Sequence, residues 1–181
     1  CLPKTGQTTS YSAGDDGDLE MGVAWPSPRF TDNLDGTVKD NLTGLVWTKD
    51  ANLPNSAMTW QQALDYVAGM NAGTYPNFGY TDWRLPNARE LKSLIDISQY
   101  NPALPSGHPF TNVRTGLDDW YWSSTNFMSG VWAVHMAHGA IGATLKSNNS
   151  YIWAVRAGQC GSAAICLPKT GQTTSYSAGD D

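Results

Sequence analysis

One stretch of sixteen residues occurs at both ends of this chain. CLPKTGQTTSYSAGDD occupies residues 1–16 and again residues 166–181, with identity at every position. The two copies begin 165 residues apart, so the chain contains one complete repeat and the start of another. A solenoid unit is far shorter than this and cannot fold alone, so each repeat is expected to be a whole domain. The sequence therefore predicts domains arranged in tandem.

The repeat divides into segments of different character. Polar residues dominate the beginning, which we expect to be an extended arm, and its GDDGDLE stretch is dense in carboxylates that can ligate calcium. The spacing matches no standard calcium loop, so a solvated acidic turn is favoured over a metal site. The expected parts are an arm (1–28), a folded domain (29–158), a junction (159–165) and the start of the next repeat (166–181).

Composition argues against two classes of partner. The net charge is −5, and no basic cluster is present to neutralise phosphates, so no nucleic acid partner is expected. No apolar run reaches the roughly 18 residues that indicate a membrane-spanning helix. LPKTG, at residues 2–6 and 167–171, matches a sortase sorting signal, but the residues that follow are polar where that signal needs an apolar tail.

The cysteines indicate an oxidising location. Cys1 and Cys166 occupy the same repeat position and Cys160 is the other, so each repeat has two cysteines. An even number favours a disulfide and an extracellular or cell-surface protein. A Cys160–Cys166 bond would close a short loop at the junction and leave Cys1 for a preceding copy, which we favour. A Cys1–Cys160 bond, tying together the ends of one unit, stays open, as do free thiols.

Hydrophobic spacing and turn residues predict an α+β domain. Residues 59–71 and 87–96 are expected to be helices, each with a capping box at its start, formed by Thr59 with Gln62 and by Asn87 with Glu90. Short strands are expected in 29–49, and four more in 119–157 as an antiparallel meander. We expect the helices to pack on one sheet built from both groups. Residues 97–118 are expected to be a long irregular loop.

Several blocks resemble a known family. They are FTDNLDGTVKDNLTGLVWTKDA, TWQQALDYVAGMN, GYTDWRLPNARELKSLID, YWSST and YIWAVRAG, and together they span residues 29–158. In this order they are similar to the Lcl C-terminal domain family, a bacterial family found on secreted and surface proteins. RLPNARELKSL also resembles a block of formylglycine-generating-enzyme-like domains. The resemblance implies a C-type-lectin-like fold, with two helices packed on short antiparallel strands and long loops.

The departures from these families bear on function. Val67 and Ala154 stand where family members often carry cysteines, so the shared disulfide that the family implies is missing here. The copper-binding cysteine pair of formylglycine-generating enzymes has no counterpart, and the sugar-binding motifs of calcium-dependent lectins are absent. The resemblance therefore implies neither an oxidase nor a calcium-dependent lectin.

No constellation of residues indicates catalysis. The sequence lacks a G-x-S-x-G elbow, a P-loop and a G-x-G-x-x-G fingerprint. His135 and His138 lie three residues apart in an expected strand, where their side chains would point to opposite faces and could not share a metal ion. We therefore predict a protein that is not an enzyme and needs no metal or cofactor.

Two functions fit these observations. The first is a structural repeat unit that assembles head-to-tail with copies of itself into a surface filament, each terminal copy lying extended against a neighbouring or following unit. The second is an adhesin module that recognises a glycan or a protein on a host or other cell surface. Its ligand would contact the long loop and aromatic side chains that could stack on sugar rings, namely Trp120, Tyr121, Trp122 and Trp132.

Overall fold

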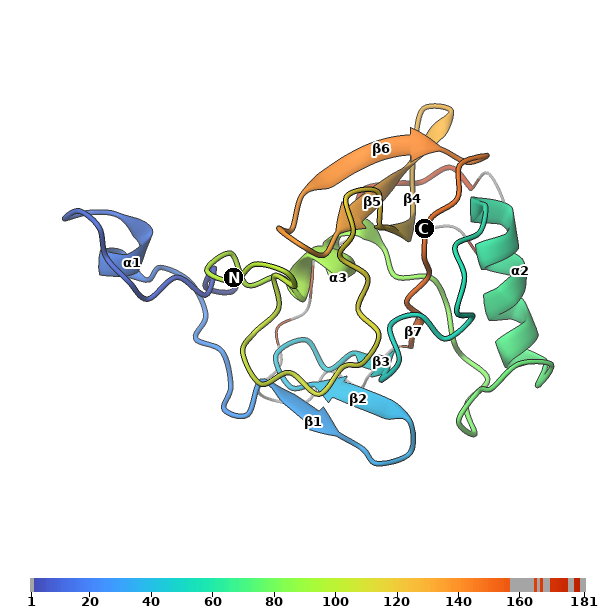
Figure 1. Ribbon diagram of the computed structural model, residues 1–181, viewed down its shortest axis with the longest axis horizontal. Coiled ribbons are helices and arrows are strands. Elements are labelled where there is room, and N and C mark those ends of the chain that lie inside the picture. The colour runs from blue at the N-terminus through green and yellow to red at the C-terminus, as the bar shows by residue number, and fades with distance from the viewer. Residues whose placement is uncertain (1, 157–164, 166, 168–169, 176–177, 180–181) are drawn as a thin grey trace.

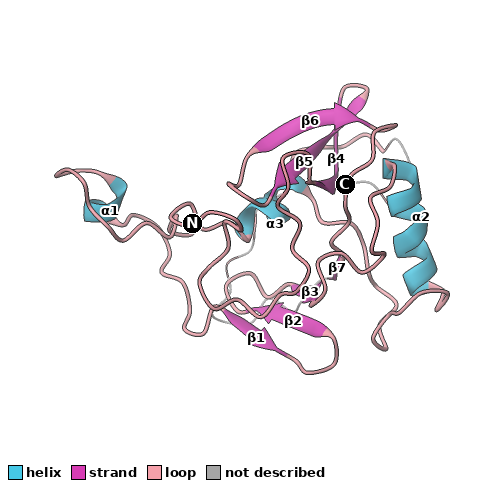
Figure 2. Cartoon of the chain, viewed as in Figure 1, coloured by secondary structure: helices cyan, strands magenta, loops and turns pink. Residues whose placement is uncertain are grey.

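Two small antiparallel sheets form the framework of the domain in the computed structural model, which describes residues 2–156, 165, 167, 170–175 and 178–179 (Figures 1 and 2). The first sheet has the strand order β1-β2-β3-β7 and the second has the order β4-β5-β6. The strands of the first sheet are β1 (Phe30–Asp32), β2 (Thr37–Asp40), β3 (Val46–Thr48) and β7 (Val155–Arg156). Those of the second are β4 (Trp120–Phe127), β5 (Gly130–His135) and β6 (Ile141–Leu145). The α+β prediction is confirmed.

The helices begin where their capping residues predict. Helix α2 (Trp60–Asn71) starts after Thr59, and helix α3 (Ala88–Ser93) starts after Asn87, each with a complete capping box. Helix α3 ends earlier than the predicted residue 96. The Asp96 N–H donates to the Ala103 carbonyl (2.9 Å), and this contact draws the chain away from the helix axis.

The last predicted strand of the meander does not pair with the other three, and the strands form two sheets instead of one. The predictions of a four-stranded meander and of one common sheet were therefore wrong. The residues from Ile152 to Val155 are all buried, so the segment runs between the two layers instead of along an exposed edge. The Tyr151 N–H donates to Trp120 (2.8 Å), and the Trp153 indole N–H donates to Thr48 (2.9 Å). Within the described residues of this segment, Val155 and Arg156 alone pair as a strand, with β3.

Aromatic side chains fill the core in two clusters. The first cluster surrounds Trp47 and Trp153, whose rings meet edge to face at 5.7 Å. The second cluster packs α2 against the β4–β6 sheet through Trp60 and Trp122. Residues 97–118 contain no helix or strand, as predicted.

The arm turns back on itself. Pro3 forms a parallel bridge with Val23, and the segment between them includes a one-turn helix, α1 (Asp16–Leu19), where a solvated turn was expected. Asp15 caps this helix, and hydrogen bonds, first that from the Tyr11 N–H, lower the pKa of its carboxyl group. Figure 1 shows α1 standing away from both sheets.

Candidate functional site: the anchor of the two copies

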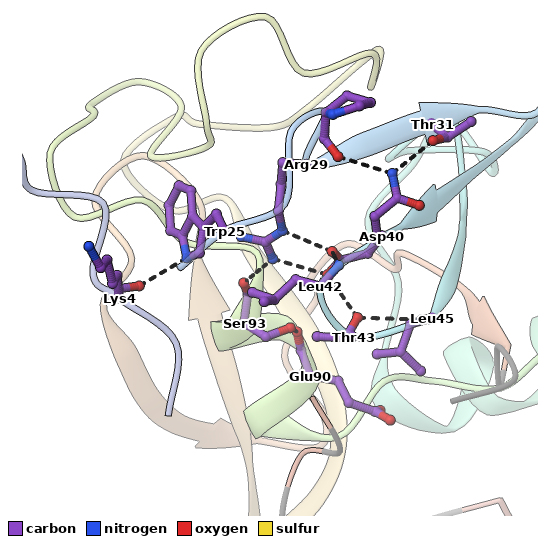
Figure 3. Close-up of polar contacts among 12 residues, drawn as sticks. Lys4, Trp25, Arg29, Thr31, Asp40, Leu42, Thr43, Leu45, Glu90 and Ser93 are labelled. Atoms are coloured by element: carbon purple, nitrogen blue, oxygen red, sulfur yellow. Dashed lines mark hydrogen bonds and ion pairs between the residues drawn. The ribbon is translucent and has the colours of Figure 1, made fainter. Parts of the chain in front are cut away.

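A buried ion pair forms the centre of the site (Figure 3). Arg29 donates through Nε and Nη2 to the two carboxylate oxygens of Asp40 (2.8 and 3.0 Å), and both side chains are almost fully buried. Nη2 also donates to the Ser93 carbonyl of α3 (2.8 Å). The bidentate geometry and the further bonds of Nη2 and of Asp40 offset part of the cost of burying two charges, although Arg29 Nη1 is buried without a hydrogen-bond partner among the described residues.

Asp40 also fixes the turn that follows β2. Its carboxylate accepts hydrogen bonds from the Leu42 N–H (2.9 Å) and the Thr43 hydroxyl (2.8 Å). An aspartate at the first position of a turn commonly bonds to the backbone two residues on. The ion pair therefore positions the backbone of Leu42 as well as that of α3.

The N-terminal copy (residues 1–16) is held through Trp25. The Arg29 guanidinium lies 4.8 Å from the centroid of this ring, and the indole N–H donates to the Lys4 carbonyl (3.0 Å; Figure 3). The Thr5 carbonyl accepts from the Ile97 N–H (3.0 Å). Positions 3–6 of the copy are thus anchored mainly through backbone groups.

Gly6 is required at this anchor. Its φ of +97° is one that side chains rarely adopt, and an added Cβ would lie 2.2 Å from Asp96 Oδ1. The same position of the other copy, Gly171, has a φ of +95° but no atom within 4 Å of such a Cβ. The close approach at Gly6 is therefore specific to the N-terminal copy.

The segment that leads to the C-terminal copy (residues 166–181) joins the same network at Leu42. The Ile165 N–H donates to the Leu42 carbonyl (2.7 Å), on the turn that Asp40 fixes. Leu167 then packs against the first core cluster, whereas Leu2, its equivalent, is 71 % exposed. Both leucines line one groove of about 380 Å³ beside α3. Burial lowers the pKa of Lys92 in this groove.

The described residues of the C-terminal copy also contact the end of β4 and helix α2. Gln172 Oε1 accepts a hydrogen bond from the Asn126 N–H (2.6 Å). Further on, Gly179 lies over Leu64, with 3.5 Å between an added Cβ and Leu64 Cδ2. We call the surface beneath this copy the receiving surface. It consists of residues of the β4–β5 hairpin and of α2, namely Thr125, Asn126, Met128, Trp132, Leu64, Val67 and Ala68.

The two copies share local structure although their surroundings differ. In each copy the Gln N–H donates to the Thr hydroxyl two residues before it (3.3 Å), in Gln7 and in Gln172. The Gln side chain donates in each to the Thr carbonyl two residues after it (3.1 Å). Gly14 and Gly179 also match, with φ of +85° and +89°. The segment's own sequence therefore encodes this conformation.

The structure separates the four aromatic residues predicted to bind a ligand. Tyr121 and Trp122 are fully buried core residues with no ring face left for a ligand, and burial raises the pKa of the Tyr121 hydroxyl. Trp120 and Trp132 are partly exposed. Trp132 lies against Phe127, with 4.7 Å between ring centroids, and belongs to the receiving surface.

The remaining predicted residues do not form a site in the described part of the chain. Cys1, Cys160 and Cys166 lie outside the described residues. The predicted divergence of the two histidines was wrong: β5 ends at His135, and the turn beyond it brings the His138 ring to 4.5 Å. Across residues 2–156 and the described part of the C-terminal copy, no three His, Cys, Asp or Glu side chains cluster as metal ligands.

Sequence reasoning missed the ion pair itself. Asp40 could be explained as a turn residue, and Arg29 follows Pro28 with nothing in its spacing that indicates burial. The available signal was that these are two opposite charges flanking a short predicted hairpin, which brings its ends together.

Comparison with known proteins places the domain between the two copies. The model of the Lcl C-terminal domain family matches residues 36–156, which lie between the arm and the C-terminal copy. No match is found among the curated proteins. None of the helices in the described residues has the length and apolar character that crossing a membrane requires. Since the match covers more than half of its residues, the chain belongs to the Lcl C-terminal domain family.

Proposed function

We propose that the chain is a non-enzymatic structural repeat unit of a bacterial extracellular fibre, in which successive units assemble head-to-tail. The observation that carries this proposal is the anchoring of two identical segments on one network. The N-terminal copy joins it through Trp25 and Arg29, and the segment leading to the C-terminal copy joins it through Leu42.

Identity of the two copies supports propagation. Chemically identical segments make the same contacts wherever they meet the same surface. A surface that holds the C-terminal copy of its own chain can therefore hold the equivalent copy of another unit. Such a contact joins different patches on the two partners, and contacts of this kind generate open chains unless they close into a ring.

The cysteines support an extracellular location. With two cysteines in each repeat, a disulfide at the junction would reinforce the links between units, and such bonds persist in oxidising surroundings. The preferred pairing remains Cys160–Cys166, with Cys1 paired to a preceding copy. Peptide mapping without reduction tests it, and a free Cys160 thiol would contradict both pairings.

Deleting either copy tests the assembly. We expect the full chain to form linear oligomers that light scattering and electron microscopy detect. Chains lacking residues 1–16 should stay folded but stop growing, because they have lost the segment that reaches another unit, whereas chains lacking residues 166–181 keep that segment and should still assemble. Monomers of all three chains under oxidising conditions would exclude the proposal.

A second candidate function is ligand binding by an adhesin. It is favoured by a groove of about 330 Å³ between the β4–β5 turn and β6, where Phe127, Met128 and Leu145 expose apolar surface. Glycan or protein binding that is lost in Phe127→Ser and Met128→Ser would support this function. Filaments formed by a chain that binds no ligand would favour the structural one.

A further inference from the structure

We infer that the terminal segment has two binding faces, and that residues 7–14 of one molecule occupy the receiving surface of another, as Gln172–Thr174, Ala178 and Gly179 occupy it here. This inference rests on the proposed head-to-tail assembly and names the surface through which it occurs. The partner is a second copy of the same chain.

The two copies contact the domain with largely different positions of the same sequence, and they share position 5. In the N-terminal copy, positions 3–6 bind to Val23, Trp25 and Ile97 through their backbone. In the described residues of the C-terminal copy, the contacts with the receiving surface come from positions 5, 7–9 and 13–14, represented by Thr170, Gln172–Thr174, Ala178 and Gly179. Leu167, at position 2, packs against the first core cluster. One segment can therefore bind to two domains at once.

The second face is exposed in the N-terminal copy. All residues from Thr8 to Gly14 are exposed, and Figure 1 shows this part of the chain projecting with α1 away from the sheets. Leu2 is exposed as well, although its equivalent Leu167 is packed against the core. The N-terminal copy thus presents most of the positions by which the C-terminal copy is held, positions 8, 9, 13 and 14 being exposed and position 7 partly buried.

Docking needs little rearrangement of the segment. The hydrogen bonds of Gln7 and the φ angles of Gly6 and Gly14 already match those of the bound copy. A segment that is ordered before binding loses less conformational entropy on binding. On the receiving surface, the Asn126 N–H supplies a donor for the Gln7 side-chain carbonyl, as it does for Gln172.

Photocrosslinking tests the contact in the full chain. A benzophenone amino acid is placed at Thr8, whose equivalent Thr173 lies on the receiving surface. Irradiating a mixture of ¹⁴N- and ¹⁵N-labelled chains should give mixed-isotope crosslinks to the β4–β5 hairpin around Thr125–Trp132. The variant Gln172→Ala should increase their yield, because it weakens the chain's own copy on that surface. A benzophenone at Leu117 is the control and should give none, because Leu117 is 94 % exposed and lies beside His135, at the opposite end of the β4–β5 hairpin from Asn126.

A peptide-binding measurement tests the two-faced segment independently of the proposed fibre. A fluorescent peptide of residues 1–16 should bind to the Gln172→Ala chain, and its Gln7→Ala form should bind about fivefold more weakly for the loss of one hydrogen bond. Oligomers whose Thr8 crosslinks map elsewhere, with no peptide binding, would overturn the two-faced segment and leave the proposed fibre standing. Peptide binding by a chain that stays monomeric would uphold the surface and exclude the fibre.

Discussion

At the residue scale, the Arg29–Asp40 pair links the domain to both copies. Asp40 neutralises Arg29 and holds the turn whose Leu42 carbonyl binds Ile165, while Arg29 supports Trp25 and thereby Lys4. Neither residue can be replaced without leaving buried polar groups unpaired. Stability and the placement of both copies are therefore coupled through two side chains.

Removing one charge of this pair should be costly. Asp40→Asn leaves the Arg29 charge buried without its partner, which we expect to lower the free energy of unfolding by about 3 kcal/mol. Urea denaturation measures the change. The control is Asp82→Asn, which breaks the half-exposed pair with Arg156 (2.6 Å) and should cost less than about 1 kcal/mol. Equal costs would show that the buried pair has no special role.

His108 should give the domain a pH dependence. Burial lowers the pKa of His108 below its ordinary value of 6.5, so the unfolded state binds a proton more readily than the folded state. The stability that the neutral imidazole contributes is fully present above pH 6.5, and it is lost as the pH falls from there through the pKa of the folded state. Melting temperatures should therefore fall less between pH 7 and 5 in His108→Gln than in the parent chain. Parallel curves would rule out His108 as the source.

At the element scale, one sequence meets two environments, which allows a matched comparison. Gly6 and Gly171 need the same left-handed conformation, so alanine at either position costs about 1 kcal/mol. Only Gly6 also meets Asp96, so Gly6→Ala should be the more damaging. Amide exchange of Ile97, which bonds to Thr5, should accelerate more in Gly6→Ala than that of Asn126 does in Gly171→Ala. Equal accelerations would mean that the copies are held alike.

The elements differ in how far sequence alone could predict them. Helices α2 and α3 were predictable because Thr59 and Asn87 form local capping boxes, and hydrophobic spacing with turn residues predicted the α+β class. The path of residues 151–155 could not be predicted from the sequence, since burial on both sides depends on distant partners such as Thr48. Trp122 and Trp132 both lie in expected strands, so the sequence could not show that Trp122 is buried and Trp132 partly exposed. That difference depends on tertiary packing.

At the scale of the whole molecule, the folded domain is flanked by copies that it holds in different ways. Ala68 is an exposed residue of α2 beneath the C-terminal copy, so Ala68→Arg should release that copy without disturbing the core. We expect oligomerisation to fall and stability to change by less than about 0.5 kcal/mol. Gln61→Arg, near the start of the same helix, is the control and should assemble normally. Intact assembly of Ala68→Arg would exclude α2 from the contact.

The first sheet has a consequence for the form of an assembled chain. Its edge strands are β1, which begins at Phe30, and β7, which ends at Arg156. Phe30 pairs with Asp40 of β2. The neighbouring residue of β2, Lys39, pairs with Val46 of β3, and Val46 pairs with Arg156. The polypeptide thus arrives and departs at one end of the sheet, about 14 Å apart across three strand spacings. Each domain would project as a pendant group to one side of a continuous polypeptide. The axial distance between pendant groups would then depend on the terminal segments, and the β4–β6 sheet would be displayed along the flank of that polypeptide.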